Sequence, residues 1–360
     1  MKIAVDGEAI FRHPYSGIAK TTTLLYRTIA ELFPTWRILM IHETPGTSNP
    51  FEGVGNVSCR RVEARGHRFA GSLNLWRDVY LPGAAAAWRA QLLHCPANTA
   101  PRWSWVPFVL TLHDLTPLEV YPREPHAIRW GQEVARSVVR ARHILTGSSH
   151  VRGMITERLG VKPESVTAIH HGPTAARTGP IDAATLSALK RRHGVAAGKE
   201  FVLVFGSSHP YKNTRRSIEA WAGLHETLRD RFTLLVVGLD DATRRELTSW
   251  VGTRCRTGDV ALCGSVPDQE VGMLLQGAAL LCYPSEVEGF GLPIVEAFTC
   301  GTPVLTSAAS SMPEVAGGAA LLVDPLSIDS IREGLAAALS REALRDELRE
   351  RDTRRLQDFS

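Results

Sequence analysis

The feature that most constrains the fold is an alternation of short apolar runs with longer helix-patterned segments. This alternation is typical of βαβ units, in which crossover helices join parallel strands. It occurs twice along the chain. In the first half the apolar runs lie at 2–6, 37–42, 91–95, 107–113, 143–147 and 166–170, and the helical patterns lie at 17–33, 124–141 and 150–159.

The second half repeats the alternation. Its apolar runs lie at 200–205, 233–238, 260–264, 279–283, 303–307 and 319–323. Its helical patterns lie at 214–229, 241–252, 268–277, 292–300 and 327–339. The sequence therefore predicts an α/β protein with two Rossmann-like domains, each built on a parallel sheet.

The domain boundary is predicted near residue 173. Segment 173–182 has no apolar period and carries Pro and Gly, as a linker does. It leaves residues 1–172 and 183–360 as the two domains, a usual size for each. Since open parallel sheets bind ligands at the carboxyl ends of their strands, we expect the site in a cleft between the domains.

Charge and composition exclude several classes of protein. A net charge of +4 is compatible with phosphorylated substrates but is far from that of a nucleic-acid-binding protein, so no nucleic-acid partner is expected. The six cysteines form no CxxC pair and mostly lie in apolar runs, which predicts reduced core residues. No apolar run is long enough to span a membrane, and the first residues do not resemble a signal peptide. We therefore expect a cytoplasmic protein.

A basic run interrupts the least regular part of the first half, at 43–70. It consists of Arg60, Arg61, Arg65, His67 and Arg68. We interpret it as a solvated surface, with a phosphate or membrane contact as the alternative.

The segment with the most chemical information is 285–297. Pro293 fits the first turn of a helix, and Gly289 and Gly291 bring backbone amides close to the start of that helix. Free amides and the helix dipole there favour a phosphate. Glu288 precedes this turn and Glu296 lies about one helical turn inside, so two carboxylates flank one anion-binding turn.

This arrangement closely resembles the Glu-x7-Glu signature of the retaining glycosyltransferases of family four, which have the GT-B fold of two Rossmann-like domains facing across a cleft. The resemblance implies that Glu288 lies against the donor sugar and that Glu296 binds the ribose hydroxyls of the nucleotide. The amides implied to contact the sugar and the phosphate are those of Gly289, Phe290, Gly291 and Leu292.

A second segment, 205–214, resembles the Gly-x5-Lys-Asn turn of the same family. A lysine at a strand-to-helix turn can neutralise a leaving diphosphate. The resemblance places Gly206 and Lys212 at the donor phosphates. The sequence lacks the arginine that the family usually supplies nearby, so we expect a second cation from His209 or Arg215, or none.

The first half contributes two candidates. His113 follows an apolar strand and resembles the family histidine that faces the donor sugar, which makes it a catalytic candidate beside Glu288 and Lys212. Gly17 lies before a predicted helix and resembles the glycine loop beside the donor phosphate.

The resemblance to this family implies a retaining hexosyltransferase that uses a GDP- or UDP-type sugar. By resemblance to mannosyl- and rhamnosyltransferases, its acceptor is a lipid-linked or saccharide precursor of a polysaccharide, met through peripheral contact with the inner face of a bacterial membrane. No Asp-x-Asp motif is present, so we expect no metal and no cofactor.

Three alternatives remain. They are an epimerase of similar build, a catalytically silent nucleotide-sugar-binding protein and a dehydrogenase. The dehydrogenase is less favoured because no Gly-x-Gly-x-x-Gly string is present.

In the family a terminal helix crosses back to the first domain. The sequence ends at about the start of that crossing, so either it is shortened there or the protein lacks this helix, and we expect freer domain motion.

Overall fold

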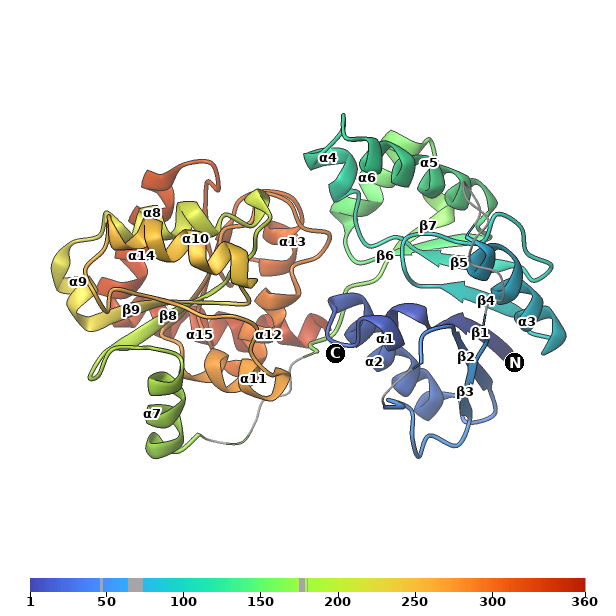
Figure 1. Cartoon of the computed structure of the whole chain (residues 1–360), viewed down its shortest axis with the longest axis horizontal. Coiled ribbons are helices and arrows are strands. Elements are labelled where there is room, and N and C mark those ends of the chain that lie inside the picture. The colour runs from blue at the N-terminus through green and yellow to red at the C-terminus, as the bar shows by residue number, and fades with distance from the viewer. Residues whose placement is uncertain (46–47, 64–73, 175–178, 180, 360) are drawn as a thin grey trace. The chain divides into compact units, whose positions relative to one another are not determined.

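Figure 1 shows the computed structural model, which describes residues 1–45, 48–63, 74–174, 179 and 181–359. The chain divides into two compact units, Met1–Thr174 and Ala175–Ser360. This division lies inside the predicted linker 173–182.

Unit 1 is a parallel sheet of seven strands in the order β3-β2-β1-β4-β5-β6-β7. The strands are β1 (Lys2–Asp6), β2 (Arg37–His42), β3 (Val57–Arg61), β4 (Leu92–Cys95), β5 (Phe108–Thr111), β6 (His143–Thr146) and β7 (Val166–Ala168). The connecting helices are α1 (Glu8–Arg12), α2 (Gly17–Leu32), η1 (Trp76–Tyr80), α3 (Leu81–Ala87), α4 (Thr116–Val120), α5 (Pro125–Arg140), α6 (Ser149–Leu159) and η2 (Pro163–Ser165).

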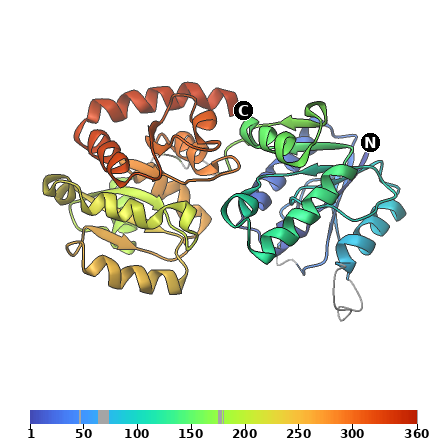
Figure 2. The ribbon, with the colours of Figure 1, turned by 90° about the horizontal axis from the view of Figure 1, so that it is seen from above.

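Both faces of this sheet are covered, because successive strand residues point to opposite sides. In β1, Ile3 and Val5 join one buried cluster with Tyr26 of α2. Ala4 joins another cluster with Val134 of α5. Strands buried on both faces are expected to be almost continuously apolar, which is why the sequence predicted them well. Figure 2 shows the helices on the two sides of the sheets.

Unit 2 is a parallel sheet of six strands in the order β10-β9-β8-β11-β12-β13. The strands are β8 (Glu200–Phe205), β9 (Phe232–Val237), β10 (Val260–Leu262), β11 (Leu280–Tyr283), β12 (Val304–Ser307) and β13 (Leu321–Val323). The helices are α7 (Ala183–Arg192), η3 (Pro210–Lys212), α8 (Thr214–Ala222), α9 (Glu226–Arg231), α10 (Asp241–Gly252), α11 (Asp268–Gly277), α12 (Leu292–Cys300), α13 (Met312–Ala316), α14 (Ile328–Ser340), α15 (Glu342–Arg355) and η4 (Leu356–Phe359). Two parallel-sheet Rossmann-like units confirm the predicted fold class.

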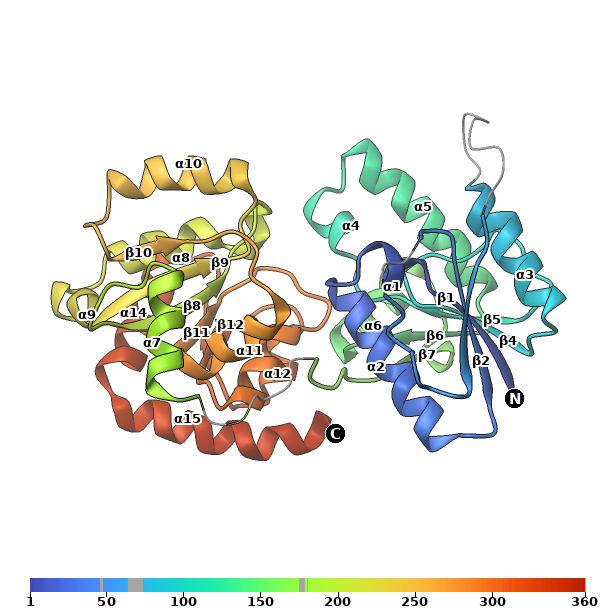
Figure 3. The ribbon, with the colours of Figure 1, turned by 60° about the horizontal axis from the view of Figure 1, so that its bottom comes forward.

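Helix α15 packs against α12 and α14 of the same unit. It lies at the bottom of the view in Figure 3. Phe359 joins the core of unit 2, where its ring meets that of Phe290 edge to face.

Several elements differ from the prediction. The single helix predicted at 214–229 is two helices, α8 and α9, separated by Gly223–His225, because glycine favours helix ends over helix interiors. Strand β3 was not predicted, since it is a polar edge strand without an apolar run. Helices α7 and α15 were also missed.

Two further predictions concern side chains. Cys95, Cys282 and Cys300 are buried, whereas Cys59, Cys255 and Cys263 are half-buried and pack against the edges of the core clusters. Of the basic run, Arg61 pairs with Glu63 at 3.0 Å, whereas Arg65, His67 and Arg68 lie outside the described residues.

Within the described ranges, no helix is both long and apolar enough to cross a membrane.

Candidate active site

The centre of the site in unit 2 is formed where β8 and β11 end side by side. The two strands are hydrogen-bonded neighbours, so the segments that follow them meet at the carboxyl edge of the sheet. Lys212 follows β8 and Glu288 follows β11, and Lys212 Nζ lies 2.7 Å from Glu288 Oε1. The hydroxyl of Tyr283, the last residue of β11, donates to the same oxygen. The structure thus brings together two predicted catalytic residues.

Backbone contacts fix this pair. The Glu286 N–H donates to the Tyr211 carbonyl at 2.8 Å and so ties the two loops together. The Glu288 carbonyl accepts from Ser310 Oγ at 2.7 Å and from Ser311 Oγ at 2.9 Å. Ser310 and Ser311 follow β12, the strand on the other side of β11, so three neighbouring strands position Glu288.

Asn213 sets the turn that carries Lys212. Its φ of 57° lies in the left-handed region, which asparagine tolerates better than most residues. Its buried amide group donates to the carbonyls of Pro284 and Pro325 at 2.7 and 2.8 Å. The side chain therefore anchors the lysine turn to the loop that leads to Glu288.

The electrostatics of the pair keep Lys212 charged. Burial would lower the pKa of Lys212, but the neighbouring Tyr283 and Glu288 outweigh it and raise that pKa above its usual value. Burial, with Glu288 second, raises the pKa of Tyr283, so the phenol stays protonated and donates. An ammonium has three N–H donors, and the bond to Glu288 uses one of them.

Helix α12 begins beside this pair with an anion-binding geometry. Gly291 caps the helix with φ of 105°, a conformation that strains any residue other than glycine, and Pro293 occupies the first turn as predicted. Among the described residues, the amides of Gly291 and Leu292 donate to no protein acceptor. Such amides, with the helix dipole, favour an anion.

The other predicted donor residues lie on or near the same helix. Glu296 is one turn inside α12 and is only 8% exposed. Phe290 is buried in the core, so its contribution to a ligand is limited to its backbone. Gly206 follows β8, where a Cβ atom would come within 2.6 Å of Val236 Cγ1, which explains a glycine at this position by packing.

The two cations suggested to replace the missing arginine are both exposed in the structure. Arg215 pairs with Glu246 on α10 at an exposed position, and His209 is exposed on the lysine turn. Arg216, which was not considered, pairs with Glu286 in the loop before Glu288. Arg216 therefore lies against the loop that carries Glu288. No motif in the sequence predicted this contact.

In unit 1, His113 lies just after β5, at the carboxyl edge of the sheet. Its backbone N–H donates to Asn98 Oδ1 at 2.7 Å, and its Nε2 lies 2.8 Å from the Pro96 carbonyl. Burial lowers its pKa, against the opposing effects of that carbonyl and of Asp114, so the ring is neutral at pH 7. A neutral ring whose Nε2 donates to Pro96 has Nδ1 as its acceptor.

Gly17 is the first residue of α2 and follows the cap Ser16, whose hydroxyl accepts from the Ala19 N–H at 3.2 Å. The structure thus places Gly17 at a helix start, as predicted.

Two buried polar residues at this edge escaped the sequence analysis. Asp6 ends β1, and burial raises its pKa to about 7. His94 in β4 lies between Tyr26 Oη and Thr111 Oγ1, each 2.7 Å from one ring nitrogen. Both stand in apolar strands, where a single polar residue among hydrophobic ones is the signal that could have found them.

The residues that the structure describes form no cluster of metal ligands. Among the residues described, no group of three or more His, Cys, Asp or Glu side chains is arranged to hold an ion.

Comparisons with known families cover almost the whole chain. Residues 15–177 match the model of the family described as Glycosyltransferase Family 4, and residues 187–355 match that of Glycosyl transferases group 1.

Curated relatives match shorter segments. The O-antigen chain mannosyltransferase B of Escherichia coli is 34% identical over 164 residues, which are 46% of this chain and 43% of that protein. The lipopolysaccharide glucosyltransferase WaaG of Escherichia coli K12 is 31% identical over 160 residues, which are 43% and 41% of the two chains. The chain thus matches less than half the length of these two relatives.

A solved structure shares the fold over the full length. Anabaena HepE in complex with UDP-glucose has a TM-score of 0.76 at 18% identity, and the match covers 100% of this chain and 96% of that one. With the two family models and the two parallel-sheet units, this fold shows that the chain belongs to the GT-B glycosyltransferases of the group 1 and family 4 type.

Proposed function

We propose that this protein transfers a hexose from a nucleotide-diphosphate sugar to an acceptor, with retention of the anomeric configuration. The observation that carries the proposal is the Lys212–Glu288 pair beside the start of α12. It joins a half-buried cation, a carboxylate and unsatisfied amides at one sheet edge. The cation and the amides suit a diphosphate, and the carboxylate can accept hydrogen bonds from sugar hydroxyls.

In the proposed step the bond between the anomeric carbon and the donor phosphate breaks, and a bond to the acceptor oxygen forms on the same face. Departure of the nucleotide diphosphate leaves negative charge on its phosphate, which Lys212 and the amides of Gly291 and Leu292 stabilise. A phosphate oxygen takes the acceptor proton. Glu288 holds the sugar hydroxyls rather than attacking the anomeric carbon.

The sugar and the acceptor are inferred from the relatives. Mannosyl transfer in O-antigen assembly is named for one relative, and lipopolysaccharide glucosyl transfer for another. We therefore propose mannose as the sugar, with GDP or UDP as its carrier, and a lipid-linked or saccharide precursor of a surface polysaccharide as the acceptor. This acceptor would be met at the cytoplasmic face of the inner membrane.

No metal is required in this proposal, because Lys212 and the helix start supply the positive potential that a divalent ion would otherwise provide. Turnover should therefore persist in EDTA. Loss of turnover in EDTA, with recovery on addition of magnesium or manganese, would refute this part of the proposal.

The experiment that tests the donor site is nucleotide binding by calorimetry, with Glu296→Ala as the variant. Loss of charge-assisted hydrogen bonds to the ribose, each worth about 1.5 to 3 kcal/mol, should weaken binding roughly 10- to 100-fold. Glu333→Ala, in helix α14, is the matched control and should bind as the wild type does. Equal affinity of Glu296→Ala and wild type would refute the donor assignment.

A further inference from the structure

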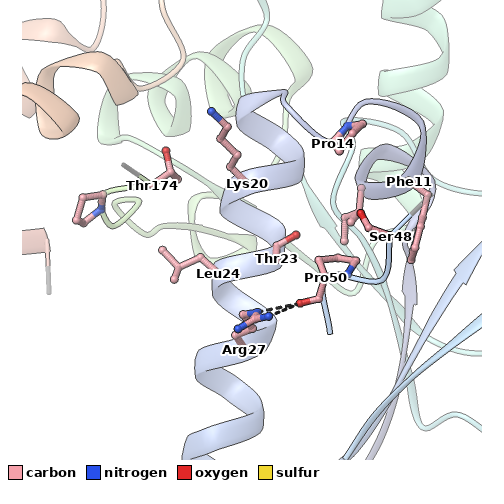
Figure 4. A pocket seen from close by; sticks show the side chains of 11 residues that line it. Phe11, Pro14, Lys20, Thr23, Leu24, Arg27, Ser48, Pro50 and Thr174 are labelled. Carbon is pink, nitrogen blue, oxygen red and sulfur yellow. Dashed lines mark hydrogen bonds between the residues drawn. The ribbon is translucent and has the colours of Figure 1, made fainter. Parts of the chain in front are cut away.

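Unit 1 has a pocket of about 300 Å³ that none of the site residues above lines. One wall is a face of α2 formed by Lys20, Thr23, Leu24 and Arg27. The last three lie three, four and seven residues after Lys20, so all four share one side of the helix. Figure 4 shows these side chains with Phe11 and Pro50 among the residues around them. The volume is at the lower end of that of small-molecule sites, about 300 to 1,000 Å³.

Two basic residues line this pocket. Lys20 and Arg27 are two helical turns apart, and no acidic residue is among the described residues that line the pocket. Arg27 donates from Nε and Nη2 to the Pro50 carbonyl, at 2.9 and 2.5 Å, and forms no ion pair with a carboxylate of the described residues. Arg12 and Arg215, also exposed arginines, each pair with a glutamate.

The other residues that line the pocket are apolar or carry a hydroxyl group. Leu24 lies between the two cations and is 40% exposed, and Ile10 and Phe11 contribute apolar surface from α1. The described lining offers neither a carboxylate nor an amide side chain, the groups that best accept hydrogen bonds from sugar hydroxyls. The pocket therefore suits an anionic group attached to an apolar chain better than a neutral sugar.

We propose that this pocket binds an anionic amphiphile, an apolar chain that ends in a phosphate or diphosphate. The phosphate pairs with Arg27, and the chain lies along Leu24 and Phe11. The inference rests on the proposed function, since it makes the pocket the place where unit 1 holds the lipid part of a lipid-linked acceptor.

The test is calorimetry on the full chain with dodecyl phosphate below its micelle concentration. Inorganic phosphate and dodecyl maltoside serve as comparison ligands. Dodecyl phosphate should bind at least roughly tenfold more tightly than either, because it alone supplies both the charge and the chain. Arg27→Gln and Leu24→Asp should each weaken its binding roughly tenfold or more, by loss of a charge-assisted bond or of apolar contact.

Matched controls are Arg129→Gln, an exposed arginine on α5, and Leu32→Asp, an exposed leucine on α2 outside the pocket. Both should bind dodecyl phosphate as the wild type does. Circular dichroism confirms the fold of each variant. Equal binding of inorganic phosphate would overturn the role of the chain, and equal binding of dodecyl maltoside would overturn the role of the charge.

Failure of the pocket and failure of the proposed function are separable, because nucleotide binding is measured on the same samples. Absence of dodecyl phosphate binding, with nucleotide binding intact, overturns the pocket proposal alone. Dodecyl phosphate binding that requires Arg27, in a protein that binds no nucleotide, supports the pocket and refutes the proposed donor site.

Discussion

Glu288 shares one carboxylate oxygen between the Lys212 ammonium and the Tyr283 hydroxyl, so its other oxygen can meet a sugar hydroxyl. Glu288→Gln keeps the shape but removes the charge. Turnover should fall about 10²- to 10³-fold, the scale for loss of one preorganised polar group, while nucleotide affinity changes little. Initial rates and calorimetry measure the two quantities.

The matched control is Glu286→Gln in the same loop, which loses an ion pair with Arg216 but not the proposed sugar contact. It should retain most of its turnover. If Glu288→Gln lost no more turnover than this control, Glu288 would have no special role.

Asp6 predicts a pH dependence of stability. Burial raises its pKa from 3.8 to about 7 in the folded protein, against the hydrogen bond from the Glu8 N–H and the charges of Arg77 and Arg12, while the Glu8 carboxylate adds to the rise. Between these values the folded chain binds more protons than the unfolded chain, so this contribution to the free energy of unfolding is full below pH 3.8 and is lost as the pH rises through about 7.

Asp6→Asn removes this dependence. The stability of the wild type relative to Asp6→Asn should therefore decrease from pH 5 to pH 8, as measured by urea unfolding. Effects of His94 and other groups are common to both proteins and cancel in the difference. Parallel curves would show that Asp6 has an ordinary pKa.

Among the elements, the turn at Asn213 carries the clearest prediction. Asn213→Ala removes two buried hydrogen bonds and places alanine at a φ of 57°. We expect a loss of about 2 to 4 kcal/mol in the free energy of unfolding of unit 2. Thr248→Ala, whose hydroxyl bonds only within exposed α10, is the control and should change the stability by much less. A loss below about 1 kcal/mol would contradict this role for Asn213.

The elements also show what the sequence could predict. Strands such as β8 and β9 are buried on both faces, so their apolar runs marked them within a residue or so. The edge strand β3 and helix α15, with its mostly charged surface, lack that signal and were missed. Glu288 and Lys212 were found because a motif carries them. Ser310, Ser311 and Tyr283 were not, since their contacts to Glu288 depend on the order of strands in the sheet.

On the scale of the whole molecule, both units follow one rule. Each is a parallel sheet whose chemically distinctive residues lie at the carboxyl ends of its central strands, which are β8 and β11 in unit 2 and β1, β4 and β5 in unit 1. Strand order therefore determines which residues meet. The sequence predicted these central strands, but the pairing of β8 with β11 had to come from the structure.

The proposed function is tested most directly by proton NMR of the first product formed from a nucleotide sugar and an acceptor. GDP-mannose is the first donor to test, followed by UDP sugars. Same-face attack, with the departing phosphate taking the acceptor proton, predicts that the anomeric coupling of the product matches that of the donor. An inverted coupling would contradict the proposed mechanism and the role given to Glu288.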